Sequence, residues 1–314
     1  MKRQEQPDIQ HYLLELRNSA ICTVSRLRNS WTSILQLVAL ILLTTFLVRP
    51  PGVLVVLGEP QQVQTTNPKV GVHTRLMDEV ELWKIQRTLV LAREMGAAWI
   101  VEYFPWAYIE PEAGHYDWSH SDAIIAHAAN QGLTVIARLG MVPEWARPDP
   151  EIQETTFTYL DEPAYEQFAA YAAAFAARYG DTVPYIIIWN EPNLSYEWGF
   201  RPVDPESYVK LLATVYPLVH QAHPNVNILA GALAPTLEPE GSPAGLNDLL
   251  YLERIYEADG AAYFDGLAAH AYGLVFPPEA APAPELLNFR RVELLRELMV
   301  RYGDADKPVF VTEG

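Results

Sequence analysis

The sequence contains a single cysteine, Cys22, among 314 residues, so no disulfide bond can form within the chain. Basic side chains are also scarce: 22 Lys and Arg stand against 39 Asp and Glu, for a formal net charge of −17. This balance argues against a nucleic-acid-binding protein, whose surface would be basic. Because half of the residues are hydrophobic, the composition excludes disordered, collagen-like and disulfide-framework proteins.

Motifs of several other enzyme classes are missing from the sequence. No Gly-x-Gly-x-x-Gly or Gly-x-x-x-x-Gly-Lys-Ser/Thr pattern follows the first predicted strand, so a nucleotide site has no support. There is no His-Glu-x-x-His zinc motif and no Gly-x-Ser-x-Gly nucleophile turn. The sequence therefore predicts neither a metal site nor a cofactor.

One long hydrophobic run lies near the N-terminus, at residues 31–48. Its 18 residues carry no charge and, as a helix, would span about 27 Å, close to the hydrocarbon thickness of a bilayer. Five basic residues precede the run and only Arg49 follows it directly, which predicts a cytoplasmic N-terminus. The alternatives are a cleaved signal peptide and a buried core helix.

These observations divide the chain into four parts. We expect a cytoplasmic segment at 1–30, a transmembrane signal-anchor at 31–48, a linker at 49–68 and one folded domain at 69–314. The protein would then be a single-pass protein of the cell membrane, with its folded domain outside the cytoplasm. The sequence does not indicate an oligomeric state.

From residue 69 onward, short apolar runs alternate with amphipathic stretches. Helical spacing is found at Glu79–Met95, Ala164–Tyr179, Pro205–His220 and Leu286–Tyr302. The predicted strands are Val70–His73, Trp99–Phe104, Thr134–Leu139, Tyr185–Trp189, Asn227–Gly231, Phe264–His270 and Pro308–Thr312. Seven β-then-α units predict a parallel sheet, which is either doubly wound or closed into a barrel.

The positions of polar and aromatic residues favour the barrel. They gather just after the strands, at His73, Arg75, Trp106, Trp145, Asn190, Glu191, His270, Tyr272 and Glu313. In a (β/α)₈ TIM barrel, this edge of the sheet is the active face. The eighth β/α unit is missing from this chain, and an unclosed barrel would expose strand edges. We therefore expect the sequence to be truncated, or the last unit to come from elsewhere.

Two glutamates end strands of the predicted barrel. Glu191 follows the strand at 185–189, and Glu313 follows the strand at 308–312, so both side chains are expected at one mouth. Two carboxyl groups across a cleft are what glycosidic bond cleavage requires, because one protonates the leaving oxygen and the other attacks or directs water. The alternative is that each glutamate is merely a polar residue at a strand end.

These motifs resemble those of glycoside hydrolase clan A, the retaining barrel glycosidases, with families 5 and 39 the most similar. The resemblance rests on residues 189–193 (WNEPN), 311–314 (VTEG), 106–118 (WAYIEPEAGHYDW), 143–146 (PEWA) and 270–272 (HAY). It implies that Glu191 is the acid/base, Glu313 the nucleophile and Asn190 a ligand of the sugar 2-hydroxyl. It also implies that Tyr272, in the segment that His270 begins, contacts the nucleophile.

The chain departs from the clan pattern at two places. The clan often has an arginine on strand two, where this chain offers Glu102, and the absent strand eight often brings a tryptophan to the sugar. We predict Trp145 and Trp198 as sugar platforms, with Trp106 also close to the substrate, and His73 as a hydrogen-bonding partner of a hydroxyl.

The sequence as a whole predicts a retaining glycoside hydrolase that cleaves β-O-glycosidic bonds of an oligo- or polysaccharide through two glutamates. Two alternatives remain open at this point. One is a membrane-anchored carbohydrate-binding protein that has lost activity, and the other is a transglycosylase that uses the same two residues. The sugar, the linkage and the endo or exo mode are not indicated.

Overall fold

The computed structural model describes residues 14, 17, 18, 20, 31–45, 67–151 and 153–314, in two units, Met1–Glu59 and Pro60–Gly314. In the first unit, residues 31–45 are helical with exposed side chains. The predicted transmembrane segment runs on to 48, and residues 46–48 lie outside the described residues, as does most of the predicted linker and of the segment 1–30. No helix within the described ranges has the length and apolar character needed to cross a membrane.

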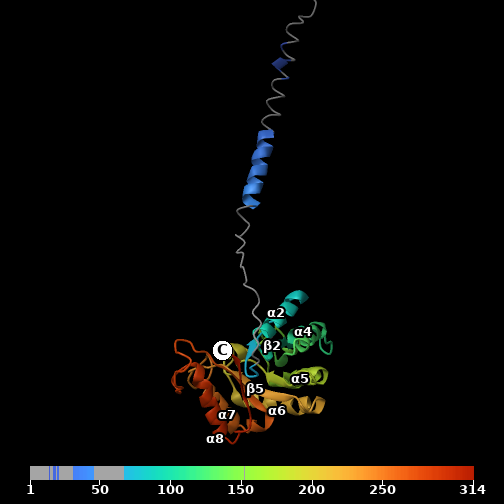
Figure 1. Ribbon diagram of the computed structural model, residues 1–314. Coiled ribbons are helices and arrows are strands. Elements are labelled where there is room, and N and C mark those ends of the chain that lie inside the picture. Colours follow the sequence, from blue (N-terminus) through green and yellow to red (C-terminus); the bar gives the residue numbers. More distant parts are fainter. Residues whose placement is uncertain (1–13, 15–16, 19, 21–30, 46–66, 152) are drawn as a thin grey trace, which may run out of the picture. The chain divides into compact units, whose positions relative to one another are not determined.

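The second unit is built around one sheet of seven parallel strands in the order β1 to β7 (Figure 1). The strands are β1 Gly71–His73, β2 Trp99–Pro105, β3 Thr134–Gly140, β4 Tyr185–Ile188, β5 Asn227–Leu233, β6 Gly266–His270 and β7 Val309–Glu313. Each predicted strand is confirmed, with bounds that shift by one or two residues. The sequential parallel order is that of a (β/α) barrel.

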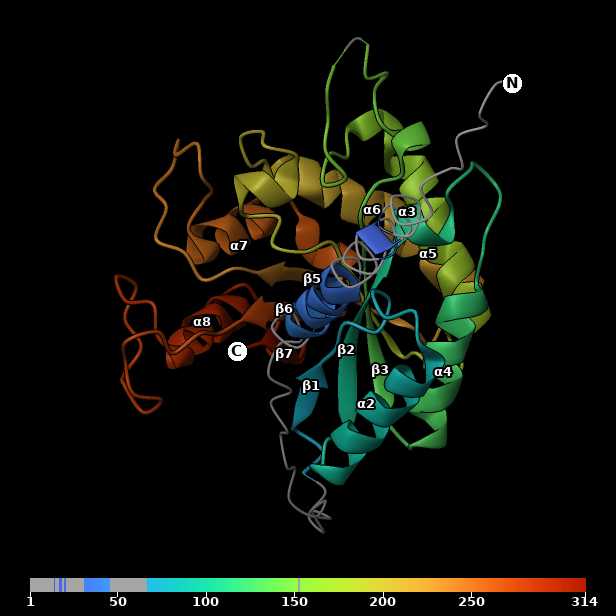
Figure 2. The same cartoon turned by 90° about the horizontal axis from the view of Figure 1, so that it is seen from above.

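Helices follow the strands and surround the sheet, as Figure 2 shows from above. They are α2 Leu82–Glu94, α3 Trp106–Ile109, α4 Ser119–Asn130, α5 Tyr165–Tyr179, α6 Pro205–Ala222, α7 Asp248–Glu257 and α8 Val292–Arg301. Short 3₁₀ turns add η1 Glu144–Ala146, η2 Glu162–Ala164, η3 Ser195–Trp198, η4 Gly260–Tyr263 and η5 Phe289–Arg291. The four predicted amphipathic stretches are confirmed as helices, although α8 begins six residues later than expected.

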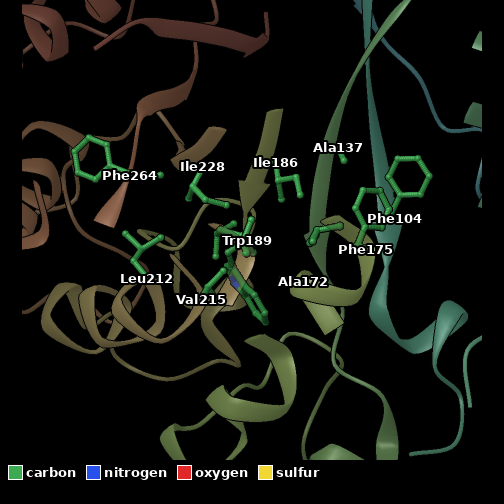
Figure 3. Close-up of a cluster of buried hydrophobic side chains, with 14 of the residues drawn as sticks. Phe104, Ala137, Ala172, Phe175, Ile186, Trp189, Leu212, Val215, Ile228 and Phe264 are labelled. Atoms are coloured by element: carbon green, nitrogen blue, oxygen red, sulfur yellow. The ribbon is translucent and has the colours of Figure 1, made fainter. Parts of the chain in front are cut away.

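The core has two layers because the strands are buried on both faces. The inner layer, inside the curve of the sheet, consists of Val101, Ile136, Ile187, Leu229, Ala232 and Ala268, with Trp99, Tyr185 and Phe310 packed against it. A larger outer layer lies between strands and helices, and Figure 3 shows part of it. There Phe168, Ala172 and Phe175 of α5 form the buried face that their spacing predicts.

β1 and β7 are the two edge strands of the described sheet. β1 pairs only with β2, and β7 pairs only with β6. The prediction of a (β/α)₈ barrel is therefore confirmed for seven strands and for the helices that follow the first six, and an eighth strand is not found among the described residues. The carboxyl ends of all seven strands meet at one face, which places the predicted site residues together.

Candidate active site

The end of β4 has an unusual backbone that sets the position of Glu191. The predicted strand includes Trp189, but the observed strand stops at Ile188 because Trp189 has φ +76° and Glu191 has φ +43°. Such left-handed conformations cost side-chain-bearing residues about 1–3 kcal/mol each and persist only where the surroundings impose them. Here the amide of Glu191 donates to Ala232 O on β5, and the amide of Trp189 donates to Leu139 O on β3.

Glu313, at the end of β7, is held by side chains from β1, β3 and β6 and from the segment just after β6. The guanidinium Nη1 of Arg138 on β3 lies 2.6 Å from Oε1 of Glu313. The hydroxyl of Tyr272 donates to Oε2 over 2.6 Å. His270 of β6, the register partner of Glu313, has its Nε2 3.5 Å from Oε1, and Nε2 of His73 lies 3.7 Å from the same oxygen.

These contacts decide the ionisation of Glu313. Burial alone would raise the pKa of its carboxyl group. The charge of His270 and the hydrogen bond from Tyr272 act in the opposite direction, and Arg138 adds both charge and a hydrogen bond. Together they lower the pKa of Glu313 to about 2, so this carboxyl group is an anion at neutral pH. An ionised carboxylate is the form that a nucleophile needs.

Glu191 is connected to Glu313 through His270. Nδ1 of His270 lies 2.7 Å from Oε1 of Glu191, while Nε2 of the same ring is 3.3 Å from Nη2 of Arg138. A hydrogen on Nδ1 of His270 is donated to Glu191. The hydroxyl of Tyr196 donates to Oε2 of Glu191 over 3.1 Å. Both carboxyl oxygens of Glu191 therefore have partners.

A cavity of about 390 Å³ opens beside Glu313 over the ends of β1 to β4. Of the predicted site residues it exposes His73, Asn190 and Glu313, and it also exposes two residues that the sequence did not single out for the site, Glu197 and Phe157. Burial lowers the pKa of His73 to about 4, helped by the positive charge of Arg138 and opposed by Glu313. His73 is therefore neutral at neutral pH and can exchange hydrogen bonds with a hydroxyl group.

The tryptophans predicted to contact the sugar do not line this cavity. Trp198 is 2% exposed and packs edge-on against the rings of Trp189 and Tyr208. Trp106 is fully buried, and Trp145 meets its ring at 5.3 Å while donating from Nε1 to Glu110 O. The structure places these rings in or against the core, because their large apolar area is buried more completely there than at the mouth.

Arg138 belongs to the site, although it is not among the site residues predicted from the sequence. It stands two residues after Ile136, which belongs to the inner core layer, so both side chains point into the barrel. A buried arginine in an apolar strand is itself a signal, since such a charge requires a partner. Glu102, which occupies the expected arginine strand, instead accepts hydrogen bonds from the amides of Leu76 and Met77 and orders the segment after β1.

Comparison with known proteins agrees with this arrangement. A family model for glycoside hydrolase family 42, described as β-galactosidase, matches residues 78–195, which include Glu191 and cover less than half of the chain. A search of curated proteins found no match. The predicted resemblance to clan A glycoside hydrolases is confirmed by this model together with the barrel fold.

Solved structures share the fold at low sequence identity. A family 39 glycoside hydrolase from Bacteroides cellulosilyticus WH2 has a TM-score of 0.59 at 21% identity, over 80% of this chain and 51% of that chain. A family 39 β-xylosidase from Caulobacter crescentus has a TM-score of 0.55 at 18% identity, over 80% and 56%. A xylanase from Paenibacillus barcinonensis has a TM-score of 0.52 at 13% identity, over 80% of this chain and 70% of that chain. The chain spans about half the length of the first two.

Proposed function

We propose that the protein is a retaining glycoside hydrolase that cleaves β-glycosidic bonds, with Glu313 as nucleophile and Glu191 as acid/base. The observation that carries the proposal is the state of Glu313, an anion held by Arg138 and Tyr272 at the wall of a cavity. A second carboxyl group, Glu191, reaches the same network through His270. This division into an anion and a separate proton donor matches the needs of a double displacement.

The reaction proceeds in two steps. In the first, a carboxylate oxygen of Glu313 attacks the anomeric carbon, the bond to the leaving oxygen breaks, and Glu191 gives that oxygen its proton. In the second, Glu191 takes a proton from water, whose oxygen attacks the anomeric carbon and releases Glu313 as a carboxylate. Asn190, which lines the cavity next to the acid, is positioned to hydrogen-bond a sugar hydroxyl.

The similar proteins point to the class of substrate. The matching family model describes a β-galactosidase, and two of the similar structures are a β-xylosidase and a xylanase. Galactose and xylose are neutral sugars, and the first two descriptions name a β-linkage. The cavity, with neutral His73 and the paired charges of Arg138 and Glu313, suits a neutral oligo- or polysaccharide as well.

The test is the configuration of the first product formed from aryl β-glycosides, including the galactoside and the xyloside. Proton NMR of the wild-type reaction should show the β-anomer first, and Glu313→Ala should lose activity. Azide should restore turnover of Glu313→Ala and give an α-glycosyl azide. An α-anomer from the wild-type protein contradicts the retaining mechanism. A product larger than the donor identifies a transglycosylase, and binding without turnover identifies a carbohydrate-binding protein.

We further propose that residues 31–48 anchor the protein in the cell membrane and that the barrel lies outside the cytoplasm. The charge-free run and the basic residues before it support this proposal. The full chain should stay in the membrane pellet after alkaline extraction, whereas a variant with Leu37 and Leu40 changed to Arg should be released. Equal release of both proteins contradicts the anchor.

A further inference from the structure

Two exposed aromatic side chains line the cavity beside Glu313. Tyr108 lies in α3, the single turn that follows β2, and Phe157 lies in the segment between β3 and α5. They are 50% and 52% exposed, although their neighbours Ile109 and Thr158 are buried. A single exposed aromatic residue needs no explanation, but two at the wall of one cavity mark a surface that a ligand can cover.

The backbone at the end of β3 fixes the segments that carry both rings. Met141 directly follows β3 and has φ +60°, a left-handed conformation that persists only where the surroundings impose it. Its carbonyl oxygen accepts the amide of Ala107, the residue before Tyr108, over 2.9 Å. The next amide, that of Val142, donates to the carbonyl oxygen of Phe157 over 2.7 Å. Two consecutive residues therefore hold both aromatic segments in place.

The backbone around Phe157 has further anchors. The hydroxyl group of Thr158 lies 2.9 Å from that of Thr156 and donates to the carbonyl oxygen of Tyr196 in η3 over 2.7 Å. The amide of Tyr159 donates to the carbonyl oxygen of Thr156 over 2.9 Å. Phe157 is thus presented to the cavity by a backbone that is already ordered. A ligand that covers its ring gains the hydrophobic stabilisation that exposure forgoes, with little cost for ordering the segment.

The remainder of the cavity wall is polar, and it includes His73, Asn190 and Glu313. A pyranose ring matches such a mixed wall, because it has carbon-bound hydrogens on its faces and hydroxyl groups around its edge. Aromatic rings pack against the faces, and polar side chains hydrogen-bond the edge. The cavity of about 390 Å³ has room for more than one pyranose ring. Since the reacting ring lies against Glu313, the aromatic wall is left for a second one.

We propose that Tyr108 and Phe157 form a subsite that binds a second sugar ring, so that the protein selects β-linked oligo- or polysaccharides over single sugars on a small leaving group. The inference rests on the proposed function, because the role of Glu313 decides which ring takes the rest of the cavity. Tyr108 and Phe157 bind the substrate and take no part in bond cleavage. They set the preference for the length of the sugar chain.

The first experiment measures binding without turnover, by calorimetry on the full chain with Glu313→Gln. The probes are xylotetraose, cellotetraose and β-1,4-galactotetraose, each compared with its monosaccharide. At least one tetraose should bind more tightly than its monosaccharide, and adding Phe157→Ala or Tyr108→Ala should weaken that binding by about tenfold. Trp83→Ala is the matched control, because Trp83 is an exposed aromatic residue on α2 that does not line the cavity.

Conservative variants separate stacking from a loss of structure. Phe157→Leu keeps an apolar side chain without an aromatic face and should weaken tetraose binding, whereas Phe157→Tyr should preserve it. The unfolding midpoints of all variants should match that of Glu313→Gln, because the replaced side chains are exposed. The subsite is overturned if no tetraose binds, or if the tetraose binds both alanine variants as tightly as Glu313→Gln.

The second experiment compares kcat/KM for the tetraose with kcat/KM for the aryl β-glycoside of the same sugar. The ratio of the two should fall by about tenfold in Phe157→Ala and in Tyr108→Ala, and Tyr108→Phe should restore it. A ratio equal to that of the wild type overturns the subsite while the proposed function stands. A chain that binds the tetraose through these two residues and cleaves no glycoside contradicts the proposed function and supports the subsite.

Discussion

Arg138 and Glu313 form an ion pair across the mouth of the barrel, with Nη1 and Oε1 2.6 Å apart and a separation of 175 positions in the sequence. The arginine is 3% exposed, so the pair is removed from water on one side. Its second terminal nitrogen contacts His270, which in turn contacts Glu191. One guanidinium on β3 thus organises both proposed catalytic carboxyl groups.

Replacement of Arg138 by Met should weaken catalysis by about 100-fold in kcat/KM, because Glu313 loses the group that orients it. Loss of the positive charge also raises the pKa of Glu313 from about 2. The acid limb of the kcat/KM profile should therefore move to higher pH. Arg138→Lys keeps a charge without the two-pronged geometry and should move the limb less. An acid limb that is identical in wild type and Arg138→Met contradicts this role of the arginine.

The low pKa of Glu313 also predicts how stability depends on pH. Its pKa is lowered from 4.5 in the unfolded chain to about 2 in the folded protein. Such a group contributes stability above pH 4.5, and the contribution is lost as pH falls toward 2. In urea titrations, the difference in free energy of unfolding between wild type and Glu313→Gln should shrink from pH 5 to pH 2. A difference that does not change with pH shows that the ion pair does not stabilise the fold.

A second buried ion pair lies away from the site and is expected to support the fold alone. Asp248 at the start of α7 and Arg291 in η5 are each about 2% exposed in their side chains, and their atoms approach to 2.9 Å. Asp248→Ala leaves a buried guanidinium without its carboxylate and should lower the free energy of unfolding by about 3–5 kcal/mol. The exposed pair of Arg290 and Glu293 supplies the control, since Glu293→Gln should leave the unfolding midpoint almost unchanged. Equal effects of the two substitutions contradict the importance of burial.

The sequence predicts the strands well because β4 and its neighbours are continuous apolar runs with polar residues directly after them. It also predicts that Glu191, Glu313, His270 and Tyr272 come together, since parallel strands end at a common face. It also predicts Trp145 and Trp198 as sugar platforms, and the cavity beside Glu313 is lined by neither. Trp145 and Trp198 follow strands as expected, yet packing against Trp106 and Trp189 takes them toward the core.

Arg138 and Glu197 show a different limit of sequence reasoning. Both belong to the site through contacts between distant segments, Arg138 with Glu313 and Glu197 with the end of β4. The alternation of β3 indicates only that Arg138 faces the barrel interior. Its partner depends on the register of β3 and β7 around the barrel, which no local pattern contains.

The most direct test of the account is to trap the covalent intermediate. A 2-deoxy-2-fluoro aryl β-glycoside slows both chemical steps. With a good leaving group, the covalent intermediate forms faster than water hydrolyses it, so the intermediate accumulates. After incubation with the full chain and digestion, mass spectrometry should find the fluorosugar on the peptide that contains Glu313, and the label should disappear in Glu313→Gln. Label on another carboxyl group, or turnover of the natural glycoside by Glu313→Gln at the wild-type rate, would contradict the assignment of Glu313 as nucleophile.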